Sequence, residues 1–95
     1  MEIIKVSSSS IPNHVAGAIA SLMREQESLM IQTIGAAALN QAVKAIAIAR
    51  GYIVPTGKEL ICIPSFHDLM VDDKQITAIR LLWERKWMKT VYFFD

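Results

Sequence analysis

The amino-acid sequence predicts an α/β domain whose elements follow the order β-α-β-α-β-β. Short β-branched runs alternate with segments of helical periodicity over the first half of the chain. A glycine turn leads directly from one such run into a long alanine-rich helix, and two strand-like runs near the end flank an Asp-Asp-Lys turn. This order implies a single four-stranded mixed sheet with both helices on one face.

The first strand and helix are predicted from residues 2 to 27. Glu2 to Val6 is a short β-branched run, and Ser7 to Ser10 is a polar loop. Pro12 suits the first turn of a helix, which ends in water at Arg24 to Glu27. Its apolar residues recur at helical spacing: Val15, Ile19, Leu22 and Met23.

The second strand is predicted over Leu29 to Ile34, and Gly35 then turns the chain into the long helix, for which Gly51 is the expected C-cap. One side of this helix should form an apolar stripe of Leu39, Ala42, Val43 and Ile46. The opposite side is nearly as apolar: Ala37, Gln41, Lys44, Ala45 and Ile48. A helix without a polar side is usually buried on more than one side, which in a short chain indicates a subunit interface.

The last two strands are predicted on either side of a hairpin tip at 72–74. Leu60 to Ile63 is apolar on both faces, which is typical of a central strand, and Pro64 should end it. Ser65 to Met70 is less regular. Ile76 to Trp83 forms the final strand, with Arg80 on one face and these residues on the other: Thr77, Ile79, Leu81 and Trp83.

The chain divides into one domain over residues 1–85 and an aromatic C-terminal extension over residues 86–95. With 95 residues the chain is long enough to fold without a disulfide or a metal. The extension is strongly aromatic where chains usually fray. It is expected to pack on its own sheet or on a neighbouring subunit, although Lys86 and Lys89 beside Trp87 leave base stacking as an alternative.

Charge and cysteine content narrow the function classes. Ten basic and nine acidic residues give a net charge of +1, so any anion site must come from local clustering. The single Cys62 excludes an internal disulfide and fits a reducing compartment. The sequence shows no signal peptide and no apolar run as long as a membrane span, so we expect a cytoplasmic protein without a membrane partner.

Catalytic and metal chemistry find little support. His14 and His67 are the only histidines, and Cys62 lies in an apolar strand where a thiol is an inert hydrophobe. Asp72 and Asp73 fit a solvated turn, because no further ligands stand at useful spacing. We therefore expect no enzyme, no catalytic residue, no metal and no cofactor.

Binding has more support, with open alternatives. Basic residues spread along the chain could converge in the fold, or could be ordinary surface charges: Lys5, Lys44, Arg50, Lys74 and Arg80. Serine hydroxyls and backbone N–H groups at the start of the first helix could hold a phosphate. Asn40, Gln41 and Lys44 could contact a ligand or form hydrogen bonds across a dimer interface. Gly35 is better explained by its tight turn than by an anion site.

Several segments together resemble the stage V sporulation protein S family over residues 1 to about 85. The segments are Lys5-Val6-Ser7, Pro12 to Ala18, Asn40 to Gly51, and Leu60 to Pro64, with Ala-Leu-Asn-Gln-Ala-Val-Lys-Ala-Ile-Ala-Ile-Ala-Arg-Gly as the signature. The family is similar in fold to the Alba chromatin proteins, so the resemblance implies a two-layer Alba-like domain. Alba-like proteins are dimers that bind DNA or RNA.

The resemblance implies a non-enzymatic regulatory protein, linked to sporulation or development, that binds nucleic acid as a homodimer or higher homo-oligomer. The second helix and the last two strands should contribute to the subunit interface. Contacts to phosphate are expected from Lys5, Asn13, Asn40, Lys44, Arg50, Lys74 and Arg80. The Ser7 to Ser10 loop departs from the family, whose members usually carry a lysine there. The alternative is a structural protein–protein interaction scaffold that binds no nucleic acid.

Overall fold

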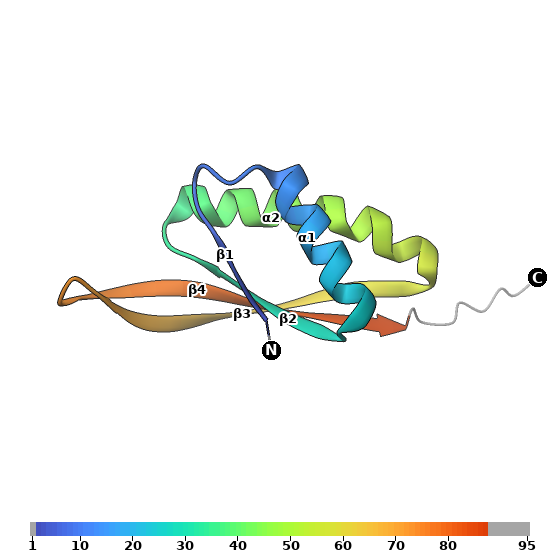
Figure 1. Ribbon diagram of the computed structural model, residues 1–95. Coiled ribbons are helices and arrows are strands. Elements are labelled where there is room, and N and C mark those ends of the chain that lie inside the picture. The colour runs from blue at the N-terminus through green and yellow to red at the C-terminus, as the bar shows by residue number, and fades with distance from the viewer. Residues whose placement is uncertain (1, 88–95) are drawn as a thin grey trace, which may run out of the picture.

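The protein, described here by a computed structural model of residues 2–87, is a four-stranded sheet with two helices packed on one face (Figure 1). Its elements are β1 (Ile3–Val6), α1 (Pro12–Glu25), β2 (Ser28–Thr33), α2 (Ala36–Ile53), the short 3-10 helix η1 (Val54–Thr56), β3 (Lys58–Val71) and β4 (Lys74–Trp87). The strand order is β1-β2-β4-β3, with β1 parallel to β2 and the other pairs antiparallel. The predicted α/β class, element order and mixed sheet are confirmed.

Both helices bury small residues where they pack. Helix α1 begins at Pro12, as predicted, and its buried residues are Ala16, Ile19, Ala20 and Met23. Gly35 has a φ of 89°, a left-handed value that glycine adopts without strain, and α2 begins at the next residue. The buried side of α2 consists largely of alanine, which lets the backbones of α1 and α2 approach closely: Ala38, Ala42, Ala45 and Ala49.

The apolar stripe predicted for α2 is rotated in the structure. Ala45, placed on the opposite side, is fully buried, whereas Val43, placed in the stripe, is 54% exposed. Hydrophobicity alone misplaced the stripe because the space against α1 and the sheet selects small side chains rather than large ones. Val43 is left on the outer surface of the described part of the chain.

The prediction that Gly51 caps the long helix is wrong. Helix α2 continues through Gly51 to Ile53, which is buried in the core, and the chain then passes into η1. The left-handed residue that ends this segment is Gly57, with a φ of 84°. Burial of Ile53 compensates for the low helix propensity of Gly51.

The prediction of a central strand over Leu60 to Ile63 is also wrong. Strand β3 lies at the edge of the sheet, runs through Pro64, and pairs with β4 from Lys58 to Val71. The segment from Ser65 to Met70, predicted to be irregular, is therefore regular strand. An edge strand accommodates proline because only one of its sides needs hydrogen bonds. Ile63 belongs to the uncovered face and is 49% exposed.

The hairpin tip is confirmed at Asp72 and Asp73, whose φ values are 50° and 62°. Such positive φ values at both central residues suit the twist of a two-residue hairpin. Strand β2 pairs with β4 only from Ile79 to Glu84, so residues 67–78 pair only with one another, and Phe66 pairs with Ile79 where the two-stranded part begins. We call residues 66–78 the hairpin arm; it projects beyond the helices (Figure 1).

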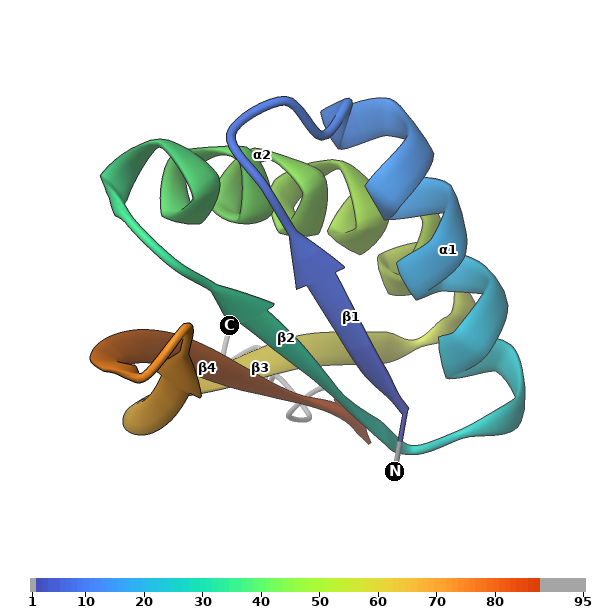
Figure 2. The same ribbon diagram turned by 60° about the vertical axis from the view of Figure 1, so that its left-hand side comes forward.

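The core lies between the helices and one face of the sheet (Figure 2). Leu29 and Ile31 of β2 pair with Trp83 and Leu81 of β4, and all four side chains are buried. Thr33 contributes a hydrogen bond from its Oγ1 to the carbonyl oxygen of Ile79, 3.2 Å away. The predicted face of β4 that holds Leu81 and Trp83 is confirmed as core. Residues 88–95 of the predicted aromatic extension lie outside the described residues.

Candidate nucleic-acid interface

The sheet face opposite the helices brings two cations together around one glutamine. Lys5 of β1 pairs with Gln32 of β2, which pairs with Arg80 of β4. Alternation along each strand places these three side chains on the uncovered face, because their neighbours Val6, Ile31 and Leu81 lie in the core. We call Lys5, Gln32 and Arg80 the open-face cluster.

A hydrogen bond orders the centre of the open-face cluster. Arg80 Nε donates to Gln32 Oε1 at 2.8 Å. Gln32 is 7% exposed, whereas Arg80 is half-buried and Lys5 is exposed. A buried amide oxygen needs a donor, and the guanidinium supplies it while its remaining N–H groups stay available for an anion. The arrangement presents two positive charges beside a polar floor.

A hollow of about 270 Å³ adjoins the open-face cluster. It is lined by Lys5, Val6, Ser7, Ser8, Gln32 and Ile34. The serine loop beside it is closed by its own hydrogen bonds: the Ser7 backbone N–H donates to Ser10 Oγ at 2.9 Å, and Ser10 N–H donates to the Ser7 carbonyl oxygen at 3.1 Å. This rim of ammonium and hydroxyl groups has the chemistry that binds a phosphate oxygen.

Three of the predicted residues lie in the first turn of α1 or in the N-terminal half of α2. Asn13 is exposed in the first turn of α1, and Asn40 and Lys44 are exposed one turn apart on α2. Gln41 instead donates from Nε2 to the carbonyl oxygen of Ser10 at 3.0 Å. Gln41 therefore has an intramolecular role, joining α2 to the serine loop, that neither of the predicted alternatives included.

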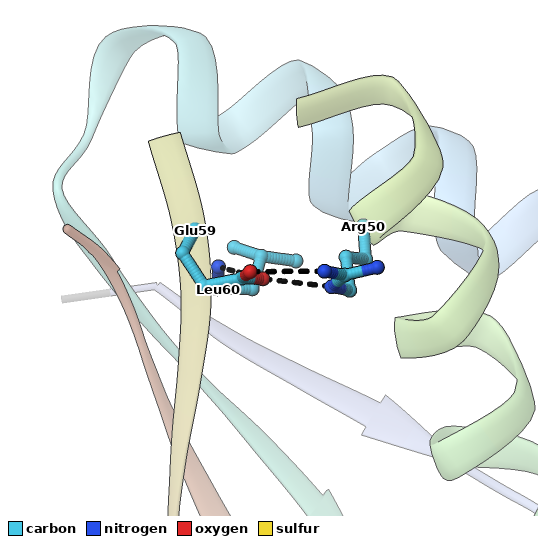
Figure 3. A network of polar contacts seen from close by, with 3 residues as sticks. All are labelled: Arg50, Glu59 and Leu60. Atoms are coloured by element: carbon cyan, nitrogen blue, oxygen red, sulfur yellow. Dashed lines mark hydrogen bonds and ion pairs between the residues drawn. The ribbon is translucent and has the colours of Figure 1, made fainter. Parts of the chain in front are cut away.

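The two remaining predicted residues lie apart from the open-face cluster. Lys74 is exposed at the tip of the hairpin arm, next to Asp72 and Asp73. Arg50 lies near the end of α2 that is remote from the serine loop, and its guanidinium binds the carboxylate of Glu59 through both oxygens, Nε to Oε1 at 2.8 Å and Nη2 to Oε2 at 3.0 Å (Figure 3). The charge of Arg50 is thus matched within the chain.

The ion pair shifts the pKa of Arg50 and the pKa of Glu59 in opposite directions. The hydrogen bond and the charge of Glu59 raise the pKa of Arg50. The hydrogen bond from Arg50, with a second from the Leu60 backbone N–H at 3.1 Å, lowers the pKa of the Glu59 carboxyl. Both residues therefore hold their charges more strongly than they would in the unfolded chain.

Other reactive groups are dispersed. Burial raises the pKa of the Cys62 thiol, which keeps it in the unreactive protonated form. Asp68 accepts a hydrogen bond from Thr77 Oγ1 at 3.0 Å rather than facing its neighbour His67. Over residues 2–87, no three His, Cys, Asp or Glu side chains gather as metal ligands. Within the same residues, no helix combines the length and apolar character needed to span a membrane.

Sequence reasoning missed Gln32 and Glu59. Gln32 is a polar residue between Ile31 and Thr33 in a strand that is otherwise buried, and a polar side chain at such a position needs a specific partner. That signal could have identified Gln32. Glu59 carries no comparable signal, because its role depends on where α2 passes over the start of β3.

Two comparisons with known proteins agree with this architecture. Residues 2–86 match the family model described as stage V sporulation protein S. The structure is similar to that of Alba from Thermoplasma volcanium, with a TM-score of 0.62 and 16% sequence identity, over 88% of this chain and 100% of that chain. The match to the family model covers most of the chain, and the structural similarity shows the Alba-like fold.

Proposed function

The chain belongs to the stage V sporulation protein S family, and we propose that it is a non-enzymatic regulatory protein that binds nucleic acid as a dimer. Contacts to the phosphate backbone supply most of the affinity, with little readout of bases. The observation that carries this proposal is the open-face cluster, two cations around a buried glutamine beside a hollow lined by Lys5, Gln32 and two serines. The fold shared with Alba, whose proteins bind nucleic acids, supports it.

The seven predicted residues differ in how much each contributes to binding. Lys5 and Arg80 are the principal phosphate contacts, because both flank Gln32 on the uncovered face and Lys5 lines the hollow. Asn13, Asn40 and Lys44 are secondary contacts on the helices. Lys74 and Arg50 contribute least, because aspartates adjoin the first and Glu59 neutralises the second.

The dimer in this proposal uses α2 and the last two strands. Val43 of α2 is 54% exposed, and Ile61 and Ile63 of the edge strand are 36% and 49% exposed. Burying such side chains against a second copy contributes roughly 25 cal/mol for each Å² of apolar surface removed from water. A dimer also doubles the number of phosphate contacts, and so strengthens binding by multivalency.

A scaffold that binds only protein is the second candidate function. The exposed apolar residues favour it, as does a net charge of +1, which provides little attraction for a polyanion. The scaffold and the nucleic-acid binder differ in what the open-face cluster contributes, since only the binder needs its charges.

The deciding experiment measures fluorescence anisotropy of labelled duplex DNA and of labelled single-stranded RNA over a salt series. Binding at micromolar or lower concentration, weakening steeply with salt, supports backbone recognition. The Lys44→Glu and Arg80→Glu variants should lose affinity while keeping the dimer. Absence of binding by the wild-type protein at low salt would contradict the proposal and leave the scaffold.

A further inference from the structure

The hairpin arm carries large apolar side chains with no cover from the rest of the described chain. Phe66 is 81% exposed and Met70 is 70% exposed. Phe66, Asp68 and Met70 lie on the same face of β3 as the core residue Leu60. This face is on the side of the sheet that bears the helices. Two large exposed apolar residues on one projecting element are typical of a contact surface.

The charge of the hairpin arm selects the class of partner. Its formal charges are those of three aspartates and one lysine: Asp68, Asp72, Asp73 and Lys74. This excess of negative charge repels the phosphate backbone, so the arm suits a nucleic acid less than it suits a protein. A protein surface with apolar residues and nearby cations is complementary to it.

The chain itself provides such a surface at its other end. A cleft of about 230 Å³ lies between the C-terminal parts of α1 and α2 and the start of β3. Its lining combines apolar residues with cations: Ala20, Met23, Tyr52 and Ile53 with Arg24 and Lys58. An apolar cavity of roughly 150 Å³ is enough to bind benzene, so this cleft has room for a phenylalanine ring.

The arm cannot reach the cleft of its own chain. Phe66 lies eight residues along β3 from Lys58, at the cleft, and a strand rises about 3.3 Å per residue, giving a separation of roughly 26 Å. A regular strand fixes that distance. Phe66 can therefore fill only the cleft of another molecule.

We propose that the hairpin arm of one copy docks in the cleft of a second copy, with the Phe66 ring in the cleft and Asp68 facing Arg24 at its rim. Both surfaces lie on the side of the sheet that bears the helices, so two antiparallel copies exchange arms about a twofold axis and the contact closes. The proposal rests on the dimerisation proposed above, with the contact on the helix-bearing side of the sheet instead of at Ile61 and Ile63, and it is independent of nucleic-acid binding.

The first test is sedimentation velocity over a concentration series, comparing the wild-type protein with Phe66→Ser. Loss of a buried aromatic anchor should raise the dimer dissociation constant roughly tenfold or more. The matched control is Val71→Ser, which makes a similar change on the opposite face of the same arm and should leave the constant nearly unchanged. A dimer that Phe66→Ser and Val71→Ser affect equally would overturn the arm contact.

Exchanging the charges of Asp68 and Arg24 tests the proposed ion pair between the two copies. Asp68→Lys and Arg24→Glu should each raise the dissociation constant, and the two changes together should recover much of the loss, because the pair is restored with opposite polarity. Additive losses in the double variant would contradict the proposed position of Asp68 against Arg24.

Disulfide trapping tests the contact directly. Both chains carry Cys62→Ser, which removes the native thiol. One chain with Phe66→Cys is mixed under oxidising conditions with a tagged chain that carries Tyr52→Cys. Tyr52 is chosen because it lines the cleft and is 62% exposed. The expected product is a mixed disulfide, and Val71→Cys in place of Phe66→Cys should not form it. A protein that is monomeric at all concentrations would overturn the arm contact and the dimer together, whereas nucleic-acid binding is measured separately by anisotropy.

Discussion

Arg80 and Gln32 lie opposite each other on neighbouring strands, and Nε of Arg80 donates a 2.8 Å hydrogen bond to Oε1 of Gln32. The buried amide oxygen is satisfied by the guanidinium, and the guanidinium is held at a fixed position on the uncovered face. One interaction therefore connects the stability of the sheet with the placement of a proposed phosphate ligand.

Replacing Gln32 with Met keeps the shape of the side chain and removes its polar atoms. We expect a loss of about 1 kcal/mol in the free energy of unfolding, because the hydrogen bond to a charged donor disappears while apolar packing is retained. Urea denaturation measures it. The control is Gln75→Met, the same change at an exposed position of β4. Equal stability of the two variants would show that the Gln32–Arg80 bond contributes nothing.

Replacing Lys5 or Arg80 with Gln removes one proposed phosphate contact. Each variant should reduce the slope of log K against log salt by about 0.9 for duplex DNA. Arg50→Gln should change the slope less, because Glu59 already neutralises that guanidinium. Anisotropy titrations at several salt concentrations give the slopes. An Arg50 effect as large as that of Lys5 would contradict the weights assigned to these residues.

Replacing Glu59 with Gln removes the ion pair with Arg50. Because folding lowers the pKa of Glu59, the pair stabilises the native state above the ordinary pKa of 4.5, and this stabilisation is lost as the pH falls through the lowered value. The wild-type protein should therefore be more stable than Glu59→Gln near neutral pH, and the difference should shrink towards zero in acid. Urea denaturation at several pH values measures the difference.

The control for that series is Glu25→Gln, at a residue that forms no ion pair with the described part of the chain. A difference for Glu59→Gln that grows in acid, or one matched by Glu25→Gln at neutral pH, would contradict the assignment.

Replacing Ala45 with Leu adds three heavy atoms where the side chain has no exposed surface. We expect a loss of about 1–3 kcal/mol in the free energy of unfolding, because the close packing of α2 leaves no room for a larger side chain. The control is Ala18→Leu, an identical change at an exposed position of α1. Thermal unfolding followed by circular dichroism compares them. Tolerance of leucine at Ala45 would show that the helix interface has space.

Local signals in the sequence predicted the elements that they control. Pro12 begins α1 because its ring fixes φ at a helical value, and Gly35 precedes α2 because glycine adopts a positive φ without strain. Asp72 and Asp73 form the hairpin turn because aspartate tolerates the left-handed conformation better than most residues. Alternation of strands and helices then limited the topology to a mixed sheet. Family membership and the Alba-like fold agree with this order.

Signals that depend on the surroundings of a residue were misleading. Gly51 resembles a C-cap, but the buried Ile53 beyond it holds the helix together. Leu60 to Ile63 resembles a central strand because both faces are apolar, whereas the structure leaves Ile61 and Ile63 on an uncovered face. Pro64 is accommodated because the strand is at the edge. Propensity describes one residue, and each of these outcomes depended on what packed against it.

The candidate interface also depends partly on local sequence and partly on tertiary structure. By itself the sequence determined the supply of basic residues, the absence of a strong net charge, and the order of the elements that carry them. Only the tertiary structure decided that Lys5 and Arg80 meet at Gln32 while Arg50 is neutralised by Glu59. The physical reason is that strand register and helix position bring together residues far apart in the chain, and the interaction between two charges depends on the distance and the medium between them rather than on their separation in sequence.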